Sequence, residues 1–122
     1  MSKYHSKKVV VDGIEFDSKR EAKRYGELLL LEKAGAITDL QRQVKYQLLP
    51  AQYRPVFDKK SRKWKDRCIE REVSYIADFQ YIENGELVVE DVKSPVTKTK
   101  DFVIKRKLML WVHGIQVRMK ES

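Results

Sequence analysis

Hydrophobic and polar positions change period several times along the chain, and each change marks the end of one expected element. Short apolar runs flank the Asp-Gly pair at 12–13, which favours a two-residue turn, so we expect a hairpin over residues 9–16. Helical spacing then runs from about Ser18 to Ala34, and Gly35 ends it. The side chains expected to face the core from this helix are Ala22, Tyr25, Leu28, Leu29 and Leu31.

Alternation of apolar and polar residues predicts two strands of the main sheet, over residues 40–48 and 73–81, and residues 87–93 are expected to form a third strand. In the second strand we expect one face to carry Val73, Tyr75, Ala77, Phe79 and Tyr81. The Asn-Gly pair at 84–85 favours a tight turn, which predicts that the second and third strands are antiparallel.

The C-terminal part predicts a helix that crosses over to a last strand. The helix covers about residues 100–113, where Thr97 or Thr99 can cap it and Gly114 closes it. The final short strand, 115–119, is expected to be parallel to the third strand. The chain is therefore expected to be one α/β domain with a mixed central sheet flanked by helices, in the order helix, three strands, helix, strand.

The net charge of the chain indicates which class of partner it binds. The chain has 26 Lys and Arg against 18 Asp and Glu, a net charge of +8, which favours nucleic acid as a partner over a merely solvated basic surface. Residues 50–71 mix cations with aromatic side chains and predict an exposed basic loop or hairpin arm, although Phe57 and Trp64 could instead fold back as a small satellite core. Residues 1–8 predict a flexible basic arm.

Cysteine and histidine usage limits the other classes of site. Cys68 is the single cysteine, which excludes an intrachain disulfide and suits a reducing cytoplasm. It has no partner at zinc-finger spacing in His5 or His113. No apolar run approaches the length of a membrane span. We therefore expect a cytoplasmic protein that has neither a zinc site nor a membrane partner.

Acidic residues in the second and third strands predict the chemistry. Asp78 lies in an otherwise apolar strand, where a carboxylate costs free energy unless it is paired or binds a metal. Asp91 and Lys93 share one face of the next strand. Two carboxylates on adjacent strands suit Mg²⁺, and a nearby lysine can orient an attacking water or offset charge on phosphorus. A one-residue bulge would exchange Asp91 for Glu90.

The alternative to this enzyme is a non-catalytic, basic nucleic-acid-binding module. In that protein Asp78 and Lys93 would form a structural ion pair inside an Asp/Lys cluster. An Asp on one strand and Asp-x-Lys on the next is a short pattern, and by itself it favours the structural interpretation. The order and the surroundings of the motifs favour the enzyme.

That order resembles the PD-(D/E)XK nuclease superfamily and, within it, a family of small phage-encoded proteins related to Holliday-junction resolvases. The resemblance spans about residues 16–117 and implies a restriction-endonuclease-like core. Ala77 stands where the superfamily's proline would be. The motifs that carry the resemblance are Phe16-x-Ser18-x-x-Glu21-Ala22, Gln43-Val44-Lys45-Tyr46, Tyr75-x-Ala77-Asp78-Phe79, Val89-Glu90-Asp91-Val92-Lys93 and Lys105-Arg106-Lys107-Leu108.

The resemblance implies a Mg²⁺- or Mn²⁺-dependent endonuclease that hydrolyses phosphodiester bonds in DNA, with branched DNA such as a four-way junction as the favoured substrate. Asp78 and Asp91 would bind the metal, Lys93 would be the catalytic lysine, and Glu21 would complete the acidic cluster. Glu21 also fits the last position of a capping box, which by itself makes it a helix cap.

The resemblance also implies partners. It implies a phage or prophage protein acting in a bacterial cell, and a homodimer is the expected way to place two coordinated cuts on one junction. Basic residues near the second helix and on the arm are the candidates for contact with phosphates. The expected nucleic-acid contacts are Lys98, Lys100, Lys105, Arg62, Lys63 and Lys65.

Overall fold

The computed structural model describes residues 8–93 and 99–121, and of Lys93 and Glu121 it describes only the backbone. The flexible basic arm expected over residues 1–8 lies outside the described residues except for Lys8. The elements in chain order are β1 (Val9–Val11), β2 (Ile14–Phe16), α1 (Lys19–Lys33), β3 (Ile37–Leu49), β4 (Gln52–Asp58), β5 (Lys63–Glu70), β6 (Val73–Glu83), β7 (Glu86–Lys93), α2 (Lys100–His113) and β8 (Arg118–Glu121).

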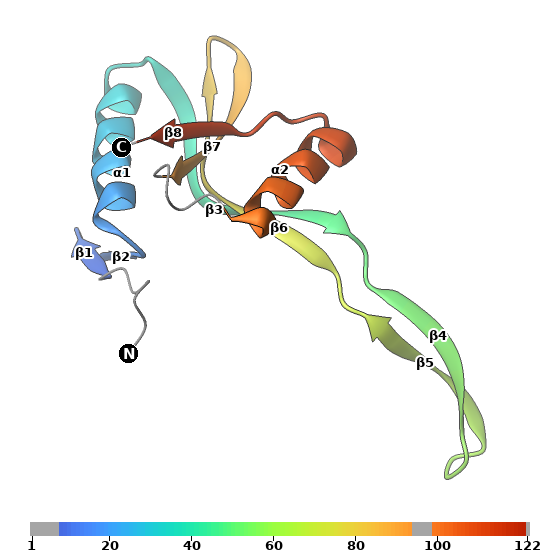
Figure 1. The fold of residues 1–122 in the computed structure, drawn as a ribbon. Coiled ribbons are helices and arrows are strands. Elements are labelled where there is room, and N and C mark those ends of the chain that lie inside the picture. The colour runs from blue at the N-terminus through green and yellow to red at the C-terminus, as the bar shows by residue number, and fades with distance from the viewer. Residues whose placement is uncertain (1–7, 94–98, 122) are drawn as a thin grey trace.

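The main sheet has four strands in the order β3-β6-β7-β8 (Figure 1). The first three strands are antiparallel to their neighbours, whereas β7 and β8 are parallel. The chain therefore has an α/β fold with a mixed sheet and two helices, as expected. The last strand begins later than the apolar pattern predicted, because residues 115–117 pack against the core before pairing starts at Arg118.

Both helices begin and end at signals that the sequence carries. The Ser18 Oγ accepts a hydrogen bond from the Glu21 N–H at 3.2 Å, and the Thr99 Oγ1 accepts one from the Phe102 N–H at 3.1 Å. Each bond satisfies a donor that the first helical turn leaves without a partner. Gly114 ends α2 with a φ of +68°, a left-handed conformation that glycine adopts at little cost.

The buried side of α1 is narrower than expected. Ala22 and Leu28 are buried, and Tyr25 stacks on Phe79 with the ring centroids 6.1 Å apart. Leu29 and Leu31 are each 36% exposed, so the expectation that they face the core is wrong. Successive helical residues are about 100° apart, and these two leucines therefore lie on either side of the row through Leu28.

Two clusters of buried side chains form the core, one under each helix. Phe79 and Tyr81 of β6 belong to the cluster under α1, whereas Tyr75 and Ala77 belong to the cluster under α2. The expectation that these odd-numbered residues share one face is therefore wrong. The buried members of the α1 cluster are Leu28, Ile37, Phe79, Tyr81, Val88 and Val92, and those of the α2 cluster are Leu48, Tyr75, Ala77, Val89, Phe102, Met109 and Val117.

The change of face occurs at Asp78 and at the neighbouring part of β3. Arg42 pairs with Phe79 and Val44 pairs with Ala77, but no pair joins Gln43 to Asp78. Gln43 has a φ of +52°, which breaks the extended conformation in the middle of β3. The sheet therefore bends at this point, and Asp78 lies between the two halves of the core.

Residues 50–71 form the hairpin arm that was one of the two expected forms. Strands β4 and β5 pair only as a two-stranded ribbon, which projects away from the rest of the fold (Figure 1). The side chains of Phe57 and Trp64 contact each other, but they remain 46% and 70% exposed. The alternative in which they fold back as a satellite core is wrong.

Candidate active site

Three carboxyl groups from three elements meet at the bend in the sheet. Glu21 comes from the first turn of α1, Asp78 from β6 and Asp91 from β7. Glu21 and Asp91 are buried, and both carboxyl groups lie within hydrogen-bonding reach of Asp78. The structure therefore brings together the three acidic residues that the sequence singled out.

The position of Asp78 is fixed by the end of the β6–β7 ladder. The pairing of these strands stops at Phe79 and Glu90, and β7 continues beside β8 instead. The Asp78 Oδ2 accepts a hydrogen bond from the Val92 N–H at 2.8 Å, which replaces the missing backbone partner on that side. The carboxyl group is thus held in the gap where β6 and β7 separate.

This environment favours a proton on Asp78. Burial raises the pKa of Asp78 to about 7, and Glu21 adds to the rise, whereas the hydrogen bond between Asp78 and Asp91 and the one from the Val92 N–H oppose it. Negative charges placed this close together cannot all ionise at low cost unless a cation lies among them. The cluster therefore takes up a proton near neutral pH, and a divalent cation could replace it.

Asp78 and Asp91 line a cleft of about 320 Å³ at the start of α2. Tyr75 lines the same cleft, and its buried hydroxyl has no hydrogen bond of normal geometry with the described part of the chain. Burial raises the pKa of Tyr75, and the neighbouring charges of Asp91 and Asp78 raise it further. The other lining residues are Ser74, Ile76, Thr99, Asp101, Phe102 and Lys105.

Lys105 brings a positive charge to this cleft. Its ammonium group pairs with Asp101 across one turn of α2 at 3.5 Å, and the side chain stays partly exposed. The sequence predicted Lys105 as a phosphate contact, and the structure places it in the lining of the cleft that Asp78 and Asp91 also line. A phosphate entering the cleft would meet this cation beside the acidic cluster.

The adjacent carboxylate, Glu90, has a different role. It is fully buried on the opposite face of β7, where the Arg24 Nε and Nη2 donate hydrogen bonds to its two oxygens at 2.7 and 2.9 Å. The Tyr81 hydroxyl donates a third bond at 2.7 Å, and burial with the Glu90 charge raises the pKa of Tyr81 to about 12. Glu90 is thus part of a structural network, and Asp91 is the carboxylate that faces Asp78.

Glu21 forms only half of the capping box that the sequence suggested. Its backbone N–H bonds to Ser18, but among the described residues no hydrogen bond joins its carboxylate to the Ser18 N–H. The carboxylate lies beside Asp78 instead. The Glu21 side chain can therefore take part in the acidic cluster, and the Ser18 side chain caps the helix.

The remaining predicted site residues that the structure describes do not line the cleft. The backbone of Lys93 belongs to β7, but its side chain lies outside the described residues, as does all of Lys98. Lys100 is exposed at the first position of α2. Arg62, Lys63 and Lys65 are exposed and lie in the β4–β5 turn or the first residues of β5, on the arm that projects away from the rest of the fold (Figure 1).

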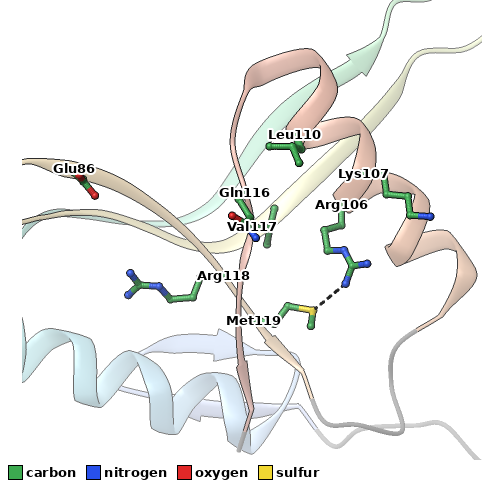
Figure 2. Close-up of a pocket in the computed structure, with 8 residues that line it drawn as sticks. All are labelled: Glu86, Arg106, Lys107, Leu110, Gln116, Val117, Arg118 and Met119. Atoms are coloured by element: carbon green, nitrogen blue, oxygen red, sulfur yellow. Dashed lines mark hydrogen bonds between the residues drawn. The ribbon is translucent and has the colours of Figure 1, made fainter.

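A larger cleft of about 810 Å³ lies between α2 and β8 (Figure 2). Arg106 and Lys107 project from α2, while Arg118 and Met119 come from β8, and the Arg106 Nη1 contacts the Met119 Sδ at 3.8 Å. Glu86 is the one carboxylate in its lining. This cleft can attract an anion, but it lacks paired acidic groups, so the smaller cleft is the candidate active site.

The donor set of the smaller cleft suits a hard divalent cation, because Mg²⁺ and Mn²⁺ prefer carboxylate oxygens. In the described part of the chain, however, no three His, Cys, Asp or Glu side chains form a ready-made metal-binding group. The carboxyl groups are instead drawn together around Asp78. Binding an ion there would therefore require the proton on Asp78 to leave and the carboxyl groups to rearrange.

The raised pKa of Asp78 predicts how stability changes with pH. The folded protein binds a proton on Asp78 below about pH 7, whereas an unfolded aspartate has already lost it above about pH 4. The metal-free protein should therefore lose about 2–4 kcal/mol of unfolding free energy between about pH 5 and pH 8 relative to Asp78→Asn. Urea unfolding of both proteins at the two pH values measures this, and equal losses would contradict the assigned pKa.

Comparison with known proteins identifies a family but no activity. No curated protein matches the chain, and no solved structure matches it. Among the described residues, no helix is long and apolar enough to cross a membrane. A family model described as protein of unknown function (DUF1064) matches residues 1–120, which is almost the whole chain, and the chain therefore belongs to this family.

Proposed function

We propose that the protein is a divalent-metal-dependent DNA endonuclease with a restriction-endonuclease-like core. The observation that carries this proposal is the meeting of Glu21, Asp78 and Asp91 at one bend in the sheet, beside an open cleft. The excess of basic residues supports DNA as the substrate. The resemblance to junction-resolving nucleases favours branched DNA, and a homodimer stays a prediction.

The acidic residues would hold Mg²⁺ or Mn²⁺ between the end of the β6–β7 ladder and the start of α1. When bound there, the cation supplies positive charge that polarises the phosphate and stabilises the charge developing on its oxygens. The Val92 N–H orients the Asp78 carboxylate, and burial keeps Glu21 and Asp91 in place. These restraints limit how far the three acidic side chains must move when the cation binds.

Two lysines are the candidates for contact with the reacting phosphate. Lys93 is the expected catalytic lysine, two residues after Asp91 in β7. Lys105 lines the cleft of Asp78 and Asp91 from α2 and can bind a non-bridging phosphate oxygen. A lysine in either position would offset the negative charge that builds up on phosphorus during hydrolysis.

Incubation of the protein with linear, flapped and four-way DNA tests the proposal. Each DNA is offered with Mg²⁺, with Mn²⁺ and with a chelator. We expect cutting that depends on metal and stops with the chelator, with four-way DNA cut fastest. If all three DNAs survive with either metal across neutral and alkaline pH, the chain is instead a non-catalytic nucleic-acid-binding module.

Glu21→Gln separates catalysis from helix capping. We expect this variant to melt at or above the wild-type temperature, because it removes one negative charge beside Asp78 and leaves the Ser18 cap intact. Cleavage should slow by at least about tenfold, roughly 1.4 kcal/mol in the barrier, because the metal site loses a charged ligand. The measurements are a thermal melt and a single-turnover cleavage rate.

Ser18→Ala is the matched control. Loss of the cap should lower stability by about 1 kcal/mol while the folded protein still cuts at the wild-type rate. If Glu21→Gln keeps full activity, Glu21 does not belong to the site, and Asp78 and Asp91 must hold the metal without it.

A further inference from the structure

The arm formed by β4 and β5 is exposed along nearly its whole length. Every residue of β5 is exposed, and Asp58 is the one residue of β4 that is not. An isolated two-stranded hairpin is only marginally stable in water, and exposed aromatic side chains on it have an unfavourable contact with solvent. The exposure of the ribbon therefore favours a role in binding a partner over a role in stabilising the fold.

The pairing register gives the ribbon two different faces. Tyr53 lies opposite Cys68, Pro55 opposite Asp66, and Phe57 opposite Trp64, so these residues point to the same side. We call this side the aromatic face, and its three rings, Tyr53, Phe57 and Trp64, are 60%, 46% and 70% exposed. The Phe57 and Trp64 rings pack with their centroids 5.5 Å apart and thus form one continuous apolar platform.

The other side of the ribbon is the cationic face. It carries Arg54 directly opposite Arg67, Val56 opposite Lys65, and Asp58 opposite Lys63. Like charges placed directly across a ribbon destabilise it, so the Arg54–Arg67 pair favours a bound anion. Asp58 neutralises only part of this charge, through a 3.0 Å ion pair with Lys65.

The hairpin turn extends the positive charge to the tip. Lys59, Lys60 and Arg62 lie between the strands, and all three are exposed. Residues 50–71 contain eight Lys and Arg against three Asp and Glu. This charge disfavours a second copy of the chain as the partner of the arm, because two arms would repel each other, and it favours a polyanion.

We propose that the arm binds DNA that exposes unpaired bases, with its cationic face along the phosphates and its aromatic face stacked on bases. Aromatic platforms bind single-stranded bases with little sequence preference, and a two-stranded ribbon is narrow enough to enter the major groove of an adjoining duplex. The inference rests on the proposed function in taking DNA as the substrate, and it adds how the DNA is recognised: through unpaired bases, which an uninterrupted duplex does not expose.

Trp64 provides a direct probe of the aromatic face. The chain has two tryptophans, and Trp111→Phe leaves Trp64 as the single one. We expect its emission to be quenched by single-stranded oligothymidylate and by four-way DNA, but not by a blunt duplex of equal length. All titrations contain a chelator, so the result does not depend on cleavage.

Two sets of variants separate the two faces. Phe57→Ala and Trp64→Ala should each weaken binding to oligothymidylate by about tenfold and leave binding to the blunt duplex unchanged. The double variant Arg54→Gln/Arg67→Gln should weaken binding to both DNAs and lower the slope of log affinity against log salt by about 2. The melting temperature of each variant checks that the body of the fold is intact.

Three outcomes would overturn this inference. The first is that Trp64 emission stays unchanged at saturating single-stranded DNA. The second is that the Phe57→Ala and Trp64→Ala variants bind single-stranded DNA as tightly as the wild type. The third is that Trp64 emission depends on protein concentration without DNA, which would indicate that a second copy of the chain binds the aromatic face. If DNA quenches the Trp64 emission as expected but no DNA is cut, only the proposed function is contradicted. A protein that cuts DNA without any change in Trp64 emission would contradict the inference about the arm alone.

Discussion

Asp91→Asn is expected to slow metal-dependent cleavage at least about 100-fold, roughly 2.7 kcal/mol in the barrier, and to leave DNA affinity within a few-fold of the wild type. The substitution keeps the size of the side chain and removes a buried negative charge beside Asp78. Affinity should persist because contacts between basic residues and phosphates dominate it. Single-turnover cleavage and fluorescence anisotropy with a chelator measure the two quantities separately.

Glu90→Gln is the matched control, because it changes the next residue on the opposite face of β7. Glu90 binds Arg24 and Tyr81 rather than the acidic cluster, so the folded variant should still cut at close to the wild-type rate. Stability should fall instead, as the charged partner of Arg24 is lost. The assignment of Asp91 to the site is wrong if Glu90→Gln stops cleavage and Asp91→Asn does not.

Arg24→Met is expected to lower the unfolding free energy by about 3–5 kcal/mol. Glu90 is 0% exposed, and its two hydrogen bonds to Arg24 compensate for the burial of its charge. Removal of the guanidinium leaves that charge with only the Tyr81 hydroxyl as a described donor. Urea unfolding at neutral pH measures the loss.

Two further variants show whether the loss comes from the unpaired charge. Arg24→Met/Glu90→Leu should recover most of the stability, because it removes both charges together. Lys45→Met breaks an exposed ion pair with Glu72 and should cost less than about 1 kcal/mol. If Arg24→Met costs no more than Lys45→Met, Glu90 does not depend on Arg24 for its place in the core.

Local signals in the sequence were sufficient to predict most of the elements. The turns at 12–13 and 84–85, the caps at Ser18 and Gly114, and the extent of β7 depend on short-range chemistry, and the structure confirms them. Alternation in β7 also separates Asp91 from Glu90, because neighbouring residues of a strand point to opposite faces. Their different partners in the structure agree with that separation.

The bend at Gln43 could not be predicted in this way. Nothing in the run of alternating residues around Gln43 indicates a left-handed backbone, which lies where the core divides between the two helices. The consequence for the site is large, because the bend places Asp78 where it can meet Glu21 as well as Asp91. Tyr75 was missed for a related reason: its spacing marks it as a core residue, and only the fold shows that it also lines the cleft.

Calorimetric titration of Mn²⁺ into the wild type and into Asp91→Asn, at a pH above the pKa of Asp78, is the most direct test of the central claim that the acidic cluster binds the metal needed for cutting. The wild type should bind Mn²⁺ at a saturable site, and Asp91→Asn should lose that binding while keeping its fold. Equal binding by the two proteins would place the metal elsewhere. The absence of saturable binding by the wild type would contradict the claim altogether.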